Sequence, residues 1–139
     1  MKRLIIATIA TILAVPVFAA ANDAIDEAAR EEGAVKTISG MVYKSIKDGK
    51  GMSPSSVNMV VVNYRGTLTN GKEFDKAQSI TFPLSRVIPC WTEGVQKMKI
   101  GGKAKLVCPP ELAYGPSGAG SDVPPNATLI FEVELLNVK

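Results

Sequence analysis

From residue 39 to the C-terminus, turn-forming residues divide the sequence into short runs rich in β-branched and aromatic side chains. Such runs predict strands, because these side chains fit a pleated, half-buried surface. Between two of the runs, Asn70-Gly71 supplies the pair that tolerates positive φ at both central positions of a tight hairpin turn. We therefore expect antiparallel strands over 40–51, 56–68, a return strand carrying Phe74 and Asp75, 79–84, 103–108 and 127–138.

One segment within this region has helical spacing. In 87–102, Pro89 suits a first helical turn, and Trp91, Val95 and Met98 share one face before the Gly101-Gly102 pair. In 127–138, by contrast, every second residue is apolar, as in a strand with one buried face. Many strands and one helix predict an α+β fold, in which an antiparallel half-barrel sheet of five to six strands wraps around one short helix.

The N-terminus differs from the rest of the chain. A basic start, an apolar run and small residues before Ala19 are typical of a secretory signal peptide, which we place at 1–19. Residues 20–38 form a short acidic arm in which a helix is plausible, and 39–139 form the domain. An uncleaved anchor is the alternative, but the run falls short of the roughly 20 residues that span a membrane. Export would place the protein in an oxidising compartment, most simply a bacterial periplasm.

Composition excludes several functions. The chain has no histidine, so it lacks the usual base of a serine or cysteine nucleophile, and its two cysteines match no zinc motif. The glycines of 115–120 precede no lysine-serine pair, which excludes a phosphate loop. With 16 basic and 13 acidic residues, two of the basic ones inside the signal segment, nucleic acid is not an expected partner. No cofactor or metal is expected.

Four stretches then carry a resemblance: "VVVNYRGTLTNGKEFD", "VIPCWTEGVQKMKIGGKAKL", "PPELAYG" and "VPPNATLIFEVELL". In this order and spacing they resemble FKBP-type peptidyl-prolyl cis-trans isomerases, particularly the secreted bacterial, Mip-like group. The similarity runs from Gly40 to Val138. It implies the half-barrel already predicted, an isomerase that helps exported proteins to fold, and binding of the family's macrolide inhibitors.

The resemblance also implies a set of site residues. Tyr64, Asp75 and Tyr114 would be catalytic, with the Asp75 carboxylate at the pocket edge near Tyr64. Trp91 would form the pocket floor, while the Ile88 N–H and the Tyr114 hydroxyl would hold substrate carbonyls. The predicted substrate-binding residues are Phe74, Ile80, Phe82, Val87, Ile88, Trp91, Val123 and Phe131, of which Ile80 and Val123 would be rim contacts.

Such a pocket needs no histidine, because rotation about an X-Pro bond transfers no proton. An apolar site disfavours the planar, more charge-separated amide relative to the twisted one. The partners would be proline-containing, unfolded or exported polypeptides. Two alternatives remain: a non-catalytic holdase that binds such segments in the same pocket, and a thiol oxidoreductase using Cys90 and Cys108.

The sequence also departs from the family pattern. The segment between Asp75 and Phe82 is shorter than usual and lacks an arginine, so Asp75 could be more exposed or paired differently. Ile80 stands where the family often has a larger residue, so that wall could be shallower and the activity lower. Cys90 stands where glycine is common, and the two cysteines could form either a disulfide or two buried thiols. Mip-like relatives carry a long helical dimerisation region, whereas only the short arm precedes this domain, so we expect a monomer.

Overall fold

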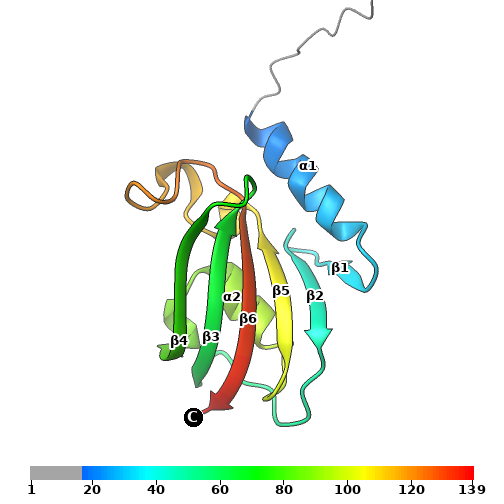
Figure 1. Cartoon of the computed structure of the whole chain (residues 1–139), viewed down its shortest axis with the longest axis vertical. Helices are drawn as coiled ribbons and strands as arrows, with labels where there is room; N and C mark the ends of the chain where they lie inside the picture. The colour runs from blue at the N-terminus through cyan, green and yellow to red at the C-terminus, as the bar shows by residue number, and fades with distance from the viewer. Residues whose placement is uncertain (1–16) are drawn as a thin grey trace, which may run out of the picture.

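The main feature of the fold is one antiparallel sheet. The computed structural model describes residues 17–139, with side chains from Asp23 onward, so most of the predicted signal segment 1–19 lies outside the described residues. Within this part of the chain, six strands are arranged in the order β1-β2-β5-β6-β3-β4 (Figure 1). Their bounds are β1 Ala34–Lys36, β2 Val42–Lys47, β3 Met59–Leu68, β4 Glu73–Pro83, β5 Lys103–Cys108 and β6 Leu129–Val138.

Helix α2 (Pro89–Val95) lies against one face of this sheet (Figure 1). The α+β half-barrel around one short helix is thus confirmed. Pro89 stands in the first turn, as expected. Close packing against β5 depends on Gly94, because a Cβ atom there would lie 2.8 Å from Leu106 Cδ2. The buried face of α2 carries Trp91 and Val95.

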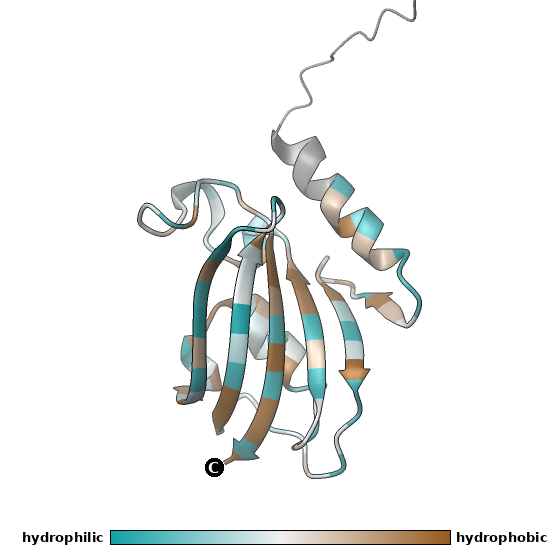
Figure 2. Ribbon diagram, viewed as in Figure 1, coloured by the Kyte–Doolittle hydropathy of each residue, from teal (hydrophilic) through white to brown (hydrophobic). Residues whose placement is uncertain are grey.

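Alternation along the strands produces the core between sheet and helix (Figure 2). On β6, the residues predicted to share a face are all buried: Leu129, Phe131, Val133 and Leu135. Neighbouring strands add side chains to the same cluster, among them Val60, Val62 and Leu106. The period of two in the sequence therefore identified the core face correctly.

Strand β4 is longer than the sequence suggested. The return strand and the separate strand expected over 79–84 form one continuous strand, with a bulge in which Gln78 and Ser79 lie opposite Asn63. Ser79 has φ of 52°, and its N–H donates to Asn63 Oδ1 at 2.8 Å. The bulge lets the strand bend without ending, which is why two predicted strands are one.

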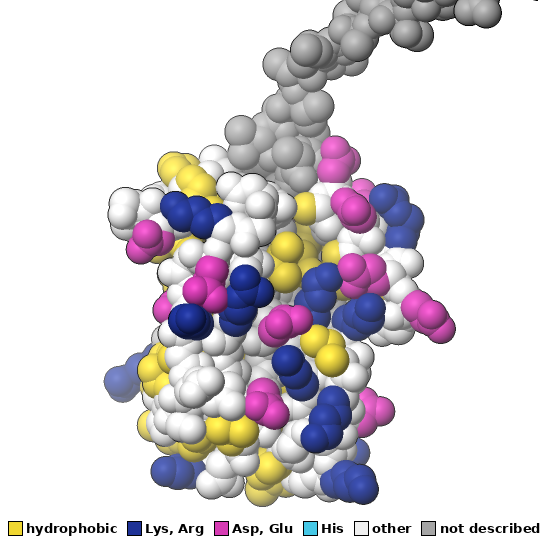
Figure 3. All heavy atoms as spheres, in the orientation of Figure 1, with side chains coloured by type: hydrophobic (Ala, Val, Ile, Leu, Met, Phe, Trp, Pro, Cys, Tyr) yellow, Lys and Arg dark blue, Asp and Glu magenta, His cyan; other side chains and the backbone are white. Residues whose placement is uncertain are grey.

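The opposite face of the sheet carries helix α1 (Val17–Ala29) and many charges (Figure 3). Ile25 and Ala28 of α1 pack against Val42 and Val107. At the end of this contact, Glu31 accepts from Lys105 Nζ at 2.9 Å and lies 3.5 Å from Lys44 Nζ. Strand β1 pairs with β2, so the predicted arm 20–38 contributes both a docked helix and an edge strand.

Candidate functional site

A cleft of about 590 Å³ opens on the α2 side of the sheet, between β4, the start of α2 and the segment around Tyr114. Its lining is largely aromatic and aliphatic, with two charged residues. The lining residues are Tyr64, Asp75, Ile80, Phe82, Arg86, Val87, Ile88, Trp91, Tyr114 and Phe131. Nine of these were predicted from the sequence, and they come from segments up to 67 positions apart in the chain.

Trp91 forms the floor of the cleft. Three rings meet its plane almost at right angles: Tyr64, Phe82 and Phe131, with centroids at 5.1, 5.7 and 5.4 Å. Edge-to-face packing of this kind favours a fixed ring orientation over a freely rotating one. Only 4% of Trp91 is exposed, so the indole presents a small, firmly held surface to whatever enters the cleft.

Tyr64 and Asp75 are joined by a hydrogen bond. The Tyr64 hydroxyl donates to Asp75 Oδ2 at 2.6 Å. Burial, followed by this hydrogen bond and the Asp75 charge, raises the pKa of Tyr64 well above its ordinary value. The phenol therefore stays protonated at neutral pH and remains the donor. Proximity of Asp75 to Tyr64 was expected from the resemblance.

A second bulge in β4 places the side chains of two consecutive residues on the same side of the sheet. Gly66 of β3 lies opposite Asp75, but the next residue, Thr67, lies opposite Glu73, so Phe74 is the extra residue. Without the bulge, Phe74 and Asp75 would face opposite sides of the sheet. Phe74 packs edge-on against Phe131, with centroids 5.6 Å apart.

Tyr114 and Ile88 each offer an uncharged hydrogen-bond donor to a ligand in the cleft. Tyr114 is 43% exposed and lies in the loop between the short 3-10 helices Pro110–Leu112 and Gly115–Ser117. Ile88 precedes the first turn of α2. Neither the Tyr114 hydroxyl nor the Ile88 N–H has a hydrogen-bond partner within residues 17–139. Both can therefore donate to carbonyl oxygens.

Two predicted contacts do not line the cleft, and one unpredicted residue does. Phe74 lies behind Phe131, and Val123 is buried in the loop, where it pairs with Ala119. Sequence reasoning missed Arg86, an exposed residue at the end of the 3-10 helix Leu84–Arg86. The sequence feature that could have indicated Arg86 was its position next to Val87, a predicted contact.

Comparison with known proteins places the chain in a family. Residues 50–136, more than half of the 139, match the sequence profile described as FKBP-type peptidyl-prolyl cis-trans isomerase. The chain belongs to this family. FkpA of Escherichia coli K12 is 51% identical over 115 residues, which cover 80% of this chain and 42% of that protein. FkpA of Aeromonas hydrophila is 49% identical with the same coverage.

Solved structures agree with this membership in an FKBP-type family. The crystal structure of FkpA from Escherichia coli has a TM-score of 0.84 and 48% identity, covering 87% of this chain and 58% of that one. A peptidyl-prolyl cis-trans isomerase from Pseudomonas syringae has a TM-score of 0.86 and 33% identity, covering 91% and 98%. The chain spans less than half the length of the curated FkpA relatives named above.

A disulfide next to the floor of this FKBP-type cleft settles the question that the sequence left open. Cys90, in the first turn of α2, is bonded to Cys108 at the end of β5, with Cα atoms 5.7 Å apart. Both residues are fully buried. Because thiol exchange requires access to a sulfur, this bond is poorly placed for a redox enzyme, which disfavours the oxidoreductase alternative.

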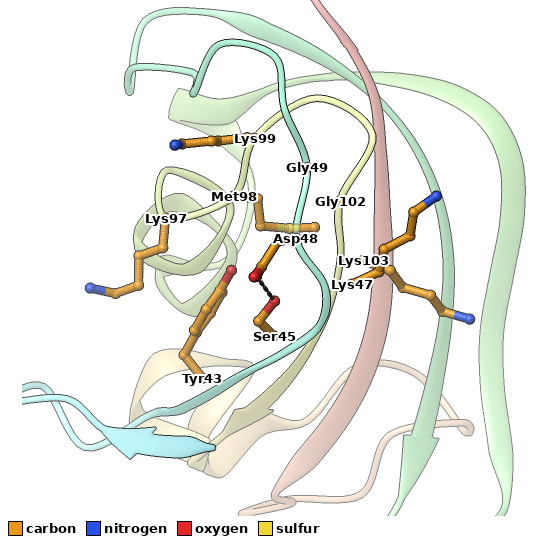
Figure 4. A pocket seen from close by; sticks show the side chains of 10 residues that line it. All are labelled: Tyr43, Ser45, Lys47, Asp48, Gly49, Lys97, Met98, Lys99, Gly102 and Lys103. Carbon is orange, nitrogen blue, oxygen red and sulfur yellow. Dashed lines mark hydrogen bonds between the residues drawn. The ribbon is translucent and has the colours of Figure 1, made fainter.

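A different pocket, of about 210 Å³, lies between β2, the end of α2 and the start of β5 (Figure 4). Four lysines surround it, but Lys97 and Lys99 extend away from its centre on one side, and Lys47 and Lys103 on the other. The Ser45 hydroxyl donates to Asp48 at 2.5 Å within it. These features make the pocket a weaker candidate than the aromatic cleft.

Among residues 17–139, no group of three or more potential ligands could hold a metal ion. No helix in the same part of the chain is long and apolar enough to cross a membrane.

Proposed function

We propose that this chain catalyses cis-trans isomerisation of the peptide bond before proline in polypeptides. The observation that carries the proposal is the aromatic cleft itself: an indole floor held by three rings, with uncharged donors from Tyr114 and Ile88 at its border. Membership in the FKBP-type family supports it. The proline ring would lie on Trp91, and the flanking carbonyls would accept hydrogen bonds from Tyr114 and Ile88.

The chemistry fits the residues present. Rotation about a peptide bond meets a barrier of about 18 to 20 kcal/mol, because amide resonance is lost in the twisted state. A million-fold acceleration requires about 8 kcal/mol of stabilisation specific to that state. Equal binding of the planar and twisted forms contributes none of it. We therefore assign the effect to the water-poor aromatic site together with donors that hold the flanking chain in a turned conformation.

Asp75 would act by positioning the Tyr64 ring. The 2.6 Å hydrogen bond fixes the phenol, and Tyr64 in turn packs against Trp91. Loss of the carboxylate would free the phenol to rotate, which alters the wall of the cleft without removing any apolar surface.

Exchange NMR on a short X-Pro peptide tests this proposal. Active protein broadens the cis and trans signals, and we expect Tyr114→Phe to lower the exchange rate about tenfold through the loss of one hydrogen bond. Asp75→Ala should lower the rate less. Tyr43→Phe is the matched control, because it removes a hydroxyl outside the cleft. Equal rates for Tyr114→Phe and Tyr43→Phe would contradict the assigned role of Tyr114.

The same cleft allows a direct binding measurement. Trp91 is the only tryptophan in the chain, so a ligand that reaches the floor changes the intrinsic fluorescence of this one residue. A family-directed macrolide should both alter this signal and abolish exchange. Peptide binding without any exchange broadening would instead establish the non-catalytic holdase.

We further propose that the protein is an exported monomer of the periplasm, acting on exported polypeptides. The signal-like sequence of residues 1–19 supports export, and a buried disulfide suits an oxidising compartment. The mixed charges on the α1 side of the sheet favour a monomer over an apolar dimer interface (Figure 3). Sedimentation at twice the chain mass would contradict the monomer.

A further inference from the structure

Arg86 is the unassigned charged residue of the cleft. It ends the 3-10 helix Leu84–Arg86, is exposed, and lines the cleft directly before Val87 and Ile88. Within residues 17–139 its side chain has neither a hydrogen bond nor an ion pair, and its neighbours Ser85 and Val87 carry no charge. Among the described residues, no carboxylate therefore pairs with the Arg86 guanidinium at the border of the cleft.

Asp75, the other charged residue of the cleft, does not neutralise the charge of Arg86. Asp75 accepts the Tyr64 hydroxyl at 2.6 Å and forms no ion pair with Arg86. All other lining residues are aromatic or aliphatic. A ligand in the cleft therefore meets one carboxylate already engaged by a phenol and one guanidinium free to bind.

We propose that Arg86 makes this cleft select segments with an acidic residue beside the proline. The inference rests on the proposed function and adds a substrate class to it. Arg86 lies two residues before Ile88, so a chain whose carbonyl accepts from the Ile88 N–H passes within reach of the long arginine side chain. A guanidinium binds carboxylate through two parallel hydrogen bonds, which favours Glu or Asp over their amides.

The expected size of the preference for an acidic residue follows from the exposure of Arg86. Ion pairs at exposed sites are weak and are screened by salt, so we expect Glu to exceed Gln by about two- to fivefold in kcat/KM at low ionic strength. Lys in the same position should fall below Gln. At about 0.5 M salt the differences should largely disappear.

The test uses two sets of acetylated, amidated peptides, Ala-Xaa-Pro-Phe and Ala-Pro-Xaa-Phe, with Glu, Gln or Lys as Xaa. Exchange NMR gives kcat/KM for each peptide, and the Glu-to-Gln ratio is the readout. We expect Arg86→Gln to bring this ratio to one and Arg86→Glu to invert it in favour of Lys. Lys97→Gln is the control: it removes the same charge from an exposed residue outside the cleft and should keep the wild-type ratio.

The outcomes separate this inference from the proposed function. Exchange on every peptide with a Glu-to-Gln ratio near one in both sets overturns the role of Arg86 and leaves the isomerase intact. A ratio that Lys97→Gln lowers as much as Arg86→Gln also overturns it, because the preference would then reflect net charge. If no peptide shows exchange, isomerase activity is refuted, and Trp91 fluorescence titration of the same peptides still measures the charge preference.

Discussion

Removing the Cys90–Cys108 disulfide should destabilise the domain by an amount that its loop length determines. The bond joins α2 to β5 with a sequence separation of 18. Loop-closure entropy for that length corresponds to about 3 kcal/mol at 25 °C, because the cross-link restricts the unfolded chain. For a domain of this size, each kcal/mol lowers the thermal midpoint by about 3 to 4 °C, so we expect a fall of about 10 °C.

The variants are Cys90→Ala, Cys108→Ala and the double substitution, followed by circular dichroism during heating. Each single substitution already breaks the bond. The two single variants and the double variant should therefore have similar thermal midpoints, and the effects of the single substitutions should not add. Wild type heated with a reductant should approach the same midpoint, since unfolding exposes the sulfurs. The native protein should resist reduction at 25 °C, because both cysteines are fully buried.

A midpoint that falls by less than about 3 °C in the double variant would refute this reasoning, as it would show that the bond contributes little. Additive effects of the single substitutions would refute it in another way. They would mean that local packing around each sulfur, rather than the closed loop, provides the stability.

Three further predictions concern other parts of the molecule. Gly66→Ala should lower both midpoint and isomerisation rate, because its Cβ would lie 2.6 Å from Phe74 Cζ and 2.9 Å from Phe131 Cε1; unchanged values would refute this contact. Isomerase activity should be nearly constant from about pH 6 to 8, since the chain has no histidine to titrate there. Hydrogen bonding from Lys105 chiefly lowers the folded-state pKa of Glu31. The stabilisation by Glu31 should therefore be complete above the unfolded pKa of about 4.5 and lost as pH falls through the lower folded pKa. The advantage of wild type over Glu31→Gln in urea unfolding should accordingly shrink as the pH is lowered below 4.5.

Local signals predicted the sheet well. The alternation over 127–138 identified β6 and its buried face, and Asn70-Gly71 marked the turn between β3 and β4. The distortions of the backbone within the strands, by contrast, could not be predicted from the sequence. Nothing in the sequence indicated that Ser79 would adopt positive φ and let one strand continue, because the distortion is stabilised by Asn63 on the neighbouring strand.

Contacts between distant segments account for the features that the sequence did not predict. The disulfide depends on how α2 packs on β5, and the spacing of the cysteines alone could not decide between a disulfide and two buried thiols. Docking of α1 depends on Val42 and Val107, whose outward faces appear only once the sheet is built. Arg86 was missed for the same reason: its role follows from the cleft rather than from any motif.

Gly66 shows why the site requires the whole sheet rather than a set of motifs. It lies opposite Asp75 on one neighbouring strand and Phe131 on the other. The bulge beside it turns Phe74 toward the same side as Asp75, and the missing side chain leaves room for both rings. Gly66 does not have positive φ, so the position requires glycine because a side chain would not fit there, not because of its backbone angles. The position of the Asp75 carboxylate and the packing behind Trp91 consequently depend on the same residue, which couples the proposed activity to the register of three strands.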